Sequence, residues 1–411
     1  MVVGIIAEYN PFHNGHRYQI EQIRKRVKNA AIVAVMSGNF TQRGEPAILN
    51  KFTRAALAVN GGCDLVLELP FTSAVRSAQD FARGGINLLK NLGIVDILVF
   101  GAEVDNIGLL KQVAKRMNDN DFKDSLHDNL QSGISYANAA CQTLSKLINI
   151  PEKILCLPNV ILAVEYLRSL ESTNITPLLI PRISAQHNDK ILRSAISSAT
   201  SIRNALYSKS PDWDNISKNI DSKTLDALKG ADLPVIEYMF RPLLTKIICS
   251  NTNELKNIYG MNEGLENRLI NAIHSTQNFN ELLDFIVSRR YTRTRIQRLV
   301  IHLLTGLTKE QVKIFDEIQY ARILAFNQRG RELIKLIKKN SHLPVITKIA
   351  QHITSRAIYK RNNILNIYRQ KLLMDIISSN IFSIMSESIK LDQEFVNSPI
   401  YINQPLSDIS L

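Results

Sequence analysis

The sequence predicts an α/β fold in which a doubly wound parallel sheet is followed by a mostly α-helical domain. Residues 1 to about 205 alternate short apolar runs with helical patterns such as Ala78–Leu92. Strand–helix alternation is typical of parallel sheets covered on both faces. After about residue 206, the strand patterns give way to helical ones. The expected strands are Val2–Ile6, Ala31–Met36, Leu65–Leu69, Ile97–Phe100 and Pro177–Ile180.

The boundaries follow from these patterns. In the strand order 3-2-1-4-5, the first and fourth strands are neighbours at the switch point where ligands bind. Residues 106 to about 150 are expected to form inserted helices. We therefore predict a sheet domain over residues 1–205 and a basic helical domain over 206–411, ending in some twenty residues without clear periodicity. The main helices expected in the second domain are Glu266–Ile273, Glu281–Val287, Arg295–Leu304, Tyr320–Ala325, Gly330–Lys338 and Asn363–Ile376.

Composition narrows the function classes. The chain has 411 residues, 45% of them hydrophobic, which is enough for two cores. Its formal net charge of +13 favours a nucleic-acid partner over the alternative of a merely basic protein. The four cysteines are scattered without a C-x-x-C pair, which argues against a zinc site or a disulfide framework and fits a reducing cytosol. With no recognisable signal peptide or membrane span, we expect a cytoplasmic protein.

The most informative stretch is the junction between the first strand and the helix after it, where His13, Gly15 and His16 lie. A helix N-terminus favours phosphate, and glycine lets the backbone approach closely. Two imidazoles could donate hydrogen bonds to phosphate oxygens as charge develops in phosphoryl or nucleotidyl transfer. The alternative, two incidental loop histidines, is disfavoured by this placement.

Other residues are expected at the same edge, because the carboxyl ends of parallel strands meet there. Gly101 follows the fourth strand and should face the two histidines. Gln42 and Arg43 follow the second strand and suit anion or carboxylate binding, with a turn-rich surface loop as the alternative. Arg182, after the fifth strand, suits phosphate, or else a surface ion pair. For residues 68–81, chemistry indicates no role.

Two helix starts and one polar stretch complete the candidate site. Ser198 begins a hydroxyl-rich turn that leads to Arg203, a combination that would bind phosphates or simply cap a helix. Asn159 precedes another helical pattern, where capping and ligand binding are equally supported by chemistry alone. The polar stretch His187–Asp189 is a weaker candidate for contact with the substrate.

Positive charge concentrates between Ser288 and Arg298, where arginines alternate with hydroxyls and a tyrosine. This composition suits RNA phosphates and base stacking, and a solvated helix face is the alternative. Residues 326–331 and Lys360–Arg369 add further charge. The RNA-binding candidates are Arg289, Arg290, Tyr291, Arg293, Arg295, Arg298 and Arg329.

These motifs carry a family resemblance. His13-x-Gly15-His16 resembles the H-x-G-H signature of the nucleotidyltransferase superfamily, and the longer string Gly4–His16 resembles the opening of bacterial tRNA(Met) cytidine acetate ligases. The turn from Ser198 to Arg203 resembles a second signature, although Ala199 replaces the serine usual in the superfamily. The resemblance implies a Rossmann-like nucleotidyltransferase domain, ATP with Mg²⁺, free acetate, and acetylation of N4 of the wobble cytidine of elongator tRNA(Met).

The resemblance also assigns roles to residues. His13, His16 and Arg203 are the expected catalytic residues, and Gln42 and Arg43, in a loop that the resemblance also covers, are the candidates for contact with acetate. No residue is assigned to direct metal ligation, and the oligomeric state is left open. The ATP-binding residues that it implies are Ala7, Glu8, Tyr9, Asn10, Pro11, Phe12, His13, Asn14, Gly15, His16, Arg17, Tyr18, Gln19, Ile20, Gly101, Asn159, Arg182, Ser198, Thr200 and Ser201.

Two other functions remain open at this point. An adenylyltransferase acting on a small phosphate-bearing metabolite would share the H-x-G-H chemistry but would leave the basic helical domain unexplained. A non-catalytic RNA-binding protein would keep the arginines but would have no need of His13, His16 and Arg203 together. Acetate-dependent exchange of pyrophosphate into ATP separates the three hypotheses.

Overall fold

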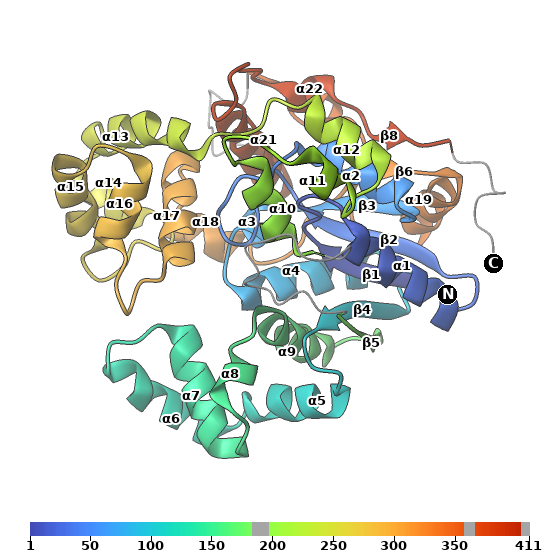
Figure 1. Cartoon of the computed structure of the whole chain (residues 1–411), viewed down its shortest axis with the longest axis horizontal. Coiled ribbons are helices and arrows are strands. Elements are labelled where there is room, and N and C mark those ends of the chain that lie inside the picture. The colour runs from blue at the N-terminus through green and yellow to red at the C-terminus, as the bar shows by residue number, and fades with distance from the viewer. Residues whose placement is uncertain (183–196, 357–365, 404–411) are drawn as a thin grey trace.

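The structure is a computed structural model of the whole chain and describes residues 1–182, 197–356 and 366–403 (Figure 1). Two sequence candidates fall on the remaining residues. His187–Asp189 lies outside the described residues, and so do residues 360–365 of the basic stretch Lys360–Arg369. Within the described ranges, no helix combines the length and the apolar composition needed to cross a membrane.

A mostly parallel sheet of eight strands forms the centre of the molecule, in the order β5-β4-β1-β2-β3-β6-β7, with β8 beside β6. The five expected strands and their order are confirmed. In β1, Ile5 lies opposite Ala34 of β2 and Val99 of β4, so β1 is central and buried on both faces. The strands are β1 (Val2–Ala7), β2 (Ala31–Ser37), β3 (Leu65–Leu69), β4 (Ile97–Ala102), β5 (Thr176–Pro181), β6 (Ala321–Phe326), β7 (Val345–Ile346) and β8 (Ile400–Tyr401).

The last part of the chain returns to this sheet, which corrects one prediction. The expected helix Tyr320–Ala325 is wrong, because residues 321–325 belong to β6, which pairs antiparallel with β3. A mainly apolar run of six residues is too short for its periodicity to separate a buried strand from a helix. Strand β8 lies in the C-terminal tail, for which the sequence shows no clear periodicity. Its Tyr401 pairs with Phe326 of β6. The division near residue 205 stays a prediction, but the second segment is not helical throughout.

Helices cover both faces of the sheet. On one face, Ile20 and Ile23 of α1 pack with Val3 and Ile32 of the sheet. On the other face, Ile86 and Leu89 of α4 belong to the core that contains Val33 and Val35. The helices near the sheet are α1 (Asn14–Arg26), α2 (Lys51–Asn60), α3 (Phe71–Ala74), α4 (Ala78–Asn91), α10 (Ala199–Leu206), α11 (Trp213–Ser217), α12 (Ser222–Lys229), α19 (Gln328–Asn340), α21 (Ile367–Ser383) and α22 (Gln393–Val396).

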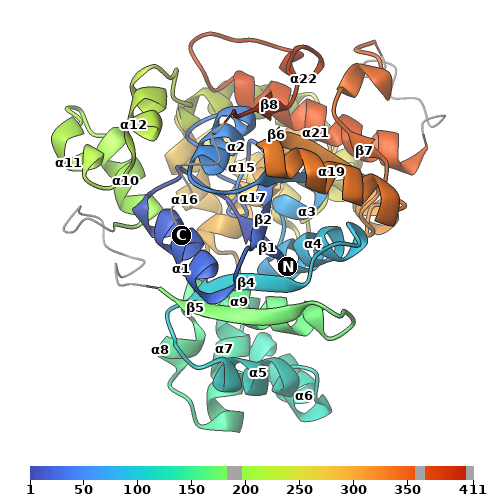
Figure 2. The same cartoon turned by 90° about the vertical axis from the view of Figure 1, so that its right-hand side faces the viewer.

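Two further groups of helices project from the sheet (Figures 1 and 2). The expected insertion extends below β4 and β5, and the second group lies to one side in Figure 1. The insertion, expected over residues 106 to about 150, comprises α5 (Ile107–Arg116), α6 (Asn120–Gln131) and α7 (Tyr136–Ile148). After it, α8 (Glu152–Leu155) and α9 (Pro158–Leu170) lead to β5, and α9 packs on α4 and β4. The second group comprises α13 (Phe240–Ile248), α14 (Thr252–Asn257), α15 (Leu265–Ser275), α16 (Phe279–Ile286), α17 (Arg293–Thr305) and α18 (Lys309–Ile314).

Candidate active site

A cavity of about 1120 Å³ opens at the carboxyl ends of β1, β4 and β5. His13, His16 and Gly101 all line it, as the doubly wound order predicts. Residues of the inserted helices and of α17 also line the cavity, so it lies between the sheet and both helical groups. A volume of this size exceeds what a nucleotide alone needs.

The two histidines are neutral hydrogen-bond donors. Nδ1 of His13 accepts a hydrogen bond from the backbone N–H of Gly15 at 3.0 Å, and Nδ1 of His16 accepts one from the N–H of His13 at 3.3 Å. Burial and the charges of Arg182 and Arg203 lower the pKa of His13 to about 3, and burial, the neighbouring His13 and Arg182 lower the pKa of His16. A neutral ring whose Nδ1 accepts carries its proton on Nε2. Each Nε2–H is therefore available to an anion.

Arg203 connects the two nucleotide motifs of the sequence. Its guanidinium donates to the carbonyl oxygen of Asn10 at 2.9 Å and lies 3.7 Å from a carboxylate oxygen of Glu45. Thr200, one turn earlier, lies 3.4 Å from the same guanidinium. The start of α10 is thereby fixed beside the H-x-G-H loop. Arg203 and Thr200 both line the cavity, where they can face phosphate oxygens.

Gly101 and Arg182 lie side by side on β4 and just beyond β5. The N–H of Arg182 donates to the carbonyl of Ala102 at 3.2 Å, which continues the pairing of the two strands. A Cβ added to Gly101 would lie 3.1 Å from Cγ of Arg182. The absence of a side chain at residue 101 therefore leaves room for the arginine at the cavity wall.

Asn159 does not cap the helix α9, which was one of its two expected roles. Leu157 occupies the N-cap position of α9, and Glu103 supplies the acceptor. Oε1 of Glu103 accepts from the side-chain amide of Asn159 at 2.7 Å, while Oε2 of Glu103 is buried without a hydrogen-bond partner among the described residues. Asn159 lines the cavity. Glu103 therefore fixes the orientation of the asparagine amide at the cavity wall.

Not every residue that the resemblance assigns to ATP reaches the cavity. Phe12 and Ile20 belong to the core, and Arg17 forms an ion pair with Asp221 at 3.1 Å. Only one face of a helix can line a cavity, so the other residues of the motif hold the helix in place from behind. The assigned residues outside the cavity lining are Pro11, Phe12, Asn14, Arg17, Ile20 and Ser201. Those in the lining are Ala7, Glu8, Tyr9, Asn10, His13, Gly15, His16, Tyr18, Gln19, Gly101, Asn159, Arg182, Ser198 and Thr200.

The loop of residues 38–50 carries the acetate candidates Gln42 and Arg43 into the cavity. The backbone N–H of Gln42 donates to Oε1 of Glu8 at 2.7 Å, and its side-chain amide donates to the carbonyl of Arg76 at 2.8 Å. The loop also packs closely on α17. A Cβ on Gly44, whose φ is +78°, would lie 2.5 Å from the backbone nitrogen of Arg298. Three separate elements thus hold this loop.

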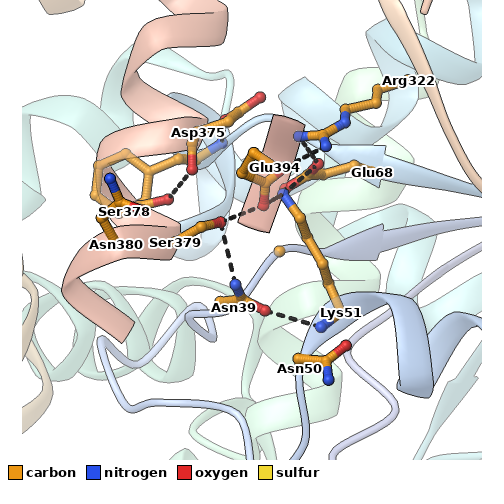
Figure 3. A network of polar contacts seen from close by, with 12 residues as sticks. Asn39, Asn50, Lys51, Glu68, Arg322, Asp375, Ser378, Ser379, Asn380 and Glu394 are labelled. Atoms are coloured by element: carbon orange, nitrogen blue, oxygen red, sulfur yellow. Dashed lines mark hydrogen bonds and ion pairs between the residues drawn. The ribbon is translucent and has the colours of Figure 1, made fainter. Parts of the chain in front are cut away.

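A buried ionic network anchors the ends of the same loop (Figure 3). Nζ of Lys51 lies 2.6 Å from a carboxylate oxygen of Glu68 and 2.8 Å from one of Glu394. Arg322 of β6 pairs with both of these glutamates. Asn39 accepts from the N–H of Lys51 at 2.8 Å. The network thereby ties the C-terminal elements β6 and α22 to the loop that carries Gln42.

The arginine cluster lies partly at the cavity and is largely paired. Arg290 and Arg298 line the cavity together with Arg295, which is placed over the ring of Tyr291 at 4.7 Å. The hydroxyl of Tyr291 donates to Glu263 at 2.6 Å. Arg293 instead contacts Asp284 and Asn280, and neither it nor Arg289 lines the cavity. Half of the cluster is therefore held in place beside the candidate ATP site.

Arg329 lies apart from this cluster. It is on α19, and its guanidinium donates to the backbone carbonyls of Asn29 and Ala30. These contacts attach α19 to the turn before β2 and give Arg329 a local structural partner. The composition of residues 326–331 is typical of a basic RNA-binding run. The sequence alone cannot reveal which of its arginines already contact other parts of the protein.

Sequence reasoning missed Arg76, which the structure places in the cavity lining. Its guanidinium forms an ion pair with Asp80 at 2.9 Å and lies over the ring of Tyr259 at 5.0 Å. Arg76 follows β3, so the rule that strand carboxyl ends share one edge could have identified it. The stretch 68–81 thus supplies both the buried Glu68 and a cavity arginine.

Comparison with known proteins identifies the family. A family model described as HIGH Nucleotidyl Transferase matches residues 1–395. The tRNA(Met) cytidine acetate ligase of Acetivibrio thermocellus is 37% identical, over 93% of this chain and 94% of the relative. That of Clostridium tetani is 36% identical, over 97% and 99%. The chain belongs to the tRNA(Met) cytidine acetate ligase family.

Solved structures agree with the family assignment. The crystal structure of Thermotoga maritima TmcAL in its apo form I has a TM-score of 0.88 at 32% identity, covering 98% of this chain and all of the other. A second form of that protein, bound with alpha-thio ATP, has a TM-score of 0.86 with the same coverage. The expected Rossmann-like nucleotidyltransferase fold is confirmed at the level of the whole chain.

Proposed function

We propose that this protein is an ATP-dependent acetate ligase that acetylates N4 of the wobble cytidine of elongator tRNA(Met). The observation that carries the proposal is the cavity in which two neutral histidines, Arg203 and the arginines of α17 come together. Family membership supports the same reaction, because the relatives of known name are tRNA(Met) cytidine acetate ligases.

The first half-reaction is formation of acetyl-adenylate. An acetate oxygen attacks the α-phosphorus of ATP, and pyrophosphate leaves. The Nε2–H groups of His13 and His16 donate to the phosphate oxygens that gain charge, and Arg203 with Thr200 binds the departing phosphates. Preorganised donors suit this step, because the protein performs no covalent chemistry of its own. Gln42 and Arg43 are the proposed contacts for the acetate carboxylate.

The second half-reaction joins the acetyl group to the RNA. N4 of cytidine attacks the acetyl carbonyl, and AMP leaves. Since this amine is a weak nucleophile, rate depends on orientation and on exclusion of water. We propose that Arg290, Arg295 and Arg298 contact the RNA backbone at the cavity mouth. We also propose that the protein works in the cytoplasm, where tRNA is modified.

Mg²⁺ is proposed to enter with ATP. Magnesium keeps several of its waters and takes its other ligands mainly from one or two carboxylates and from phosphate oxygens, so it needs no dedicated protein cage. Among the described residues, no group of three or more His, Cys, Asp or Glu side chains is arranged to hold a metal ion. Glu45, beside Arg203, is a carboxylate close to the proposed triphosphate site.

Acetate-dependent exchange of labelled pyrophosphate into ATP tests the activation step. The proposal predicts exchange that requires acetate and does not require tRNA. An adenylyltransferase for a phosphate-bearing metabolite would show exchange only with that metabolite, and a non-catalytic RNA-binding protein would show none. Either of those results would overturn the proposed function.

A further inference from the structure

The transfer step needs a proton acceptor. When N4 of cytidine forms a bond to the acetyl carbon and the bond from that carbon to the phosphate oxygen breaks, AMP leaves and N4 carries one proton too many. His13 and His16 cannot take this proton readily, because Nδ1 of each already accepts a backbone hydrogen bond and Nε2 already carries hydrogen. Another group in the cavity must supply the lone pair.

Three carboxylates line the cavity among the described residues. Glu45 is associated with Arg203 at 3.7 Å, and Glu165 forms an ion pair with Arg168 at 2.9 Å. Glu8 differs from both, because its side chain forms no ion pair within 4 Å in the part of the chain that the structure describes. Its Oε1 accepts from the N–H of Gln42, and its Oε2 receives no hydrogen bond from the described residues.

Glu8 is also held rigidly at the proposed reaction centre. Arg54, fully buried on α2, donates to the backbone carbonyl of Glu8 and to those of Ser37 and Gly38. The carboxylate thus lies between the end of β1, five residues before His13, and the loop that presents Gln42. A base positioned by its surroundings is what proton transfer in a transition state requires.

We infer that Glu8 is the general base of the transfer step and that its Oε2 accepts the proton released from N4 of cytidine. This inference rests on the proposed function and assigns to Glu8 a role other than ATP binding. The proton balance is complete: N4 loses one hydrogen, the carboxylate becomes a carboxylic acid, and AMP departs with the electron pair of the broken bond. Solvent takes the proton after the product leaves.

The surroundings of Glu8 suit this role. Burial raises the pKa of its carboxyl, although the hydrogen bond from Gln42 and the charges of Arg203 and Arg43 oppose the shift, and the charge of Glu45 adds to it. Arg54 and Tyr166 also lie within electrostatic reach. A base is most effective when its pKa approaches the working pH, so an upward shift favours catalysis. Because protonated Glu8 cannot accept, the transfer rate should fall as the pH drops through this raised pKa.

The test compares Glu8→Gln with wild type in separate half-reactions. Glutamine keeps an oxygen for the N–H of Gln42 but is not a base. Transfer from synthetic acetyl-adenylate to tRNA should fall by about 10²- to 10⁴-fold, the usual contribution of general acid–base catalysis. Acetate-dependent pyrophosphate exchange measures the activation step separately, and transfer should fall about 10²-fold more than exchange does. Formation of acetohydroxamate from acetate, ATP and hydroxylamine should follow exchange and not transfer, because hydroxylamine is a strong nucleophile that needs no base.

Glu165→Gln is the matched control, because it removes a different carboxylate from the same cavity and should not slow transfer. Wild-type transfer by Glu8→Gln, or an equal loss of exchange and transfer, would overturn the role of Glu8. If Glu8→Gln does not fold, the wild-type pH profiles decide: an acid limb in transfer from acetyl-adenylate that is absent from pyrophosphate exchange supports the inference, and identical limbs refute it. Wild-type protein that forms acetohydroxamate but never acetylates tRNA would instead refute the proposed RNA substrate.

Discussion

The imidazole rings of His13 and His16 stack with their centroids 3.8 Å apart and an interplanar angle of 32°. This proximity is possible because neither ring is charged, and both histidines line the same cavity. The arrangement arises from local sequence: His13 caps α1, and His16, three residues later, accepts from the N–H of His13 in return. The same side chains that begin the helix therefore form the phosphate site.

The first prediction concerns this pair. His16→Ala should slow acetate-dependent pyrophosphate exchange by roughly 10²-fold or more, since removal of one preorganised donor to a developing charge typically has that effect. A circular dichroism spectrum like that of wild type would exclude unfolding as the cause. Exchange at the wild-type rate would show that His16 is not part of the catalytic site.

The second prediction is the protonation state of the same histidines. Because the folded-state pKa of His13 is about 3, below its ordinary value of 6.5, protonation favours the unfolded chain. The associated stability is complete above pH 6.5 and is lost as the pH falls toward 3. Nitrogen NMR of the ATP-free protein should show a neutral Nε2–H ring for His13 from about pH 8 to about pH 5, and a neutral Nε2–H ring for His16 at neutral pH. A titration near the ordinary histidine pKa would contradict the assigned tautomers.

The third prediction separates backbone strain from a specific contact. Gly44 and Gly133 both have positive φ, +78° and +76°, but of these two only Gly44 would bring an added Cβ against other atoms, those of the α17 backbone. Gly133→Ala should cost about 1 to 2 kcal/mol of stability, the usual strain of a left-handed residue, and leave activity unchanged. Gly44→Ala should cost more and should slow transfer to tRNA. If the two variants lower the melting temperature equally, the stability of the loop of residues 38–50 does not depend on its contact with α17.

The fourth prediction concerns the buried network of Figure 3. Lys51→Met leaves Glu68 and Glu394 without their shared ammonium group and should destabilise the protein by about 3 to 5 kcal/mol, as breaking one partner of a buried pair does. The control is Asp316→Asn, which breaks the exposed pair with Arg83 and should cost about 1 kcal/mol or less. Denaturant unfolding measures both. Similar losses of unfolding free energy in the two variants would contradict a structural role for the network.

The network also predicts acid sensitivity. Burial alone would raise the pKa of Glu394, but the charges of Arg322 and Lys51 lower it to about 2, below the ordinary 4.5. Stability from this group is therefore complete above pH 4.5 and is lost as the pH falls toward 2. Glu394→Gln should be less stable than wild type at neutral pH, and the difference should shrink with acidification. A difference that is constant across this pH range would exclude the ion pairs as its source.

The fifth prediction concerns RNA. The double variant Arg290→Ala, Arg295→Ala should weaken tRNA binding and reduce the slope of log affinity against log salt by about 0.7 to 0.9 for each phosphate that the protein no longer neutralises. Pyrophosphate exchange should remain near wild type. Arg329→Ala is the matched control, because its guanidinium contacts only the carbonyls of Asn29 and Ala30 among the described residues. An unchanged slope in the double variant would mean that these arginines form a solvated surface.

Much of this site could be predicted from local sequence. The H-x-G-H junction, Gly101 and Arg203 reach one cavity because strand order follows from alternating strands and helices, which is a local signal. The position of Arg298 against Gly44, and of Glu394 against Lys51, depends on pairings between distant segments that leave no periodic trace. Strand β6 could not be recognised for a related reason: it pairs with β3, which lies far earlier in the chain, and short apolar runs carry no period of their own.

The role of individual charged residues was the least predictable property. Arg329 and Arg298 look equivalent in the sequence, yet one binds backbone carbonyls beside β2 and the other lines the cavity. Glu8 is a single acidic residue at the end of an apolar strand, and only the contact with Gln42 reveals that one of its carboxylate oxygens is held while the other is available. Such distinctions depend on tertiary contacts.

The central claim is that free acetate, activated by ATP, becomes the acetyl group of a tRNA cytidine. Nucleoside analysis of tRNA incubated with the protein, ATP and labelled acetate tests it most directly. The account predicts label in N4-acetylcytidine at the wobble position of elongator tRNA(Met), with AMP and pyrophosphate as the other products, and the same nucleoside from synthetic acetyl-adenylate without ATP. Label that enters tRNA only when acetyl-CoA is supplied, or release of ADP and phosphate, would contradict it.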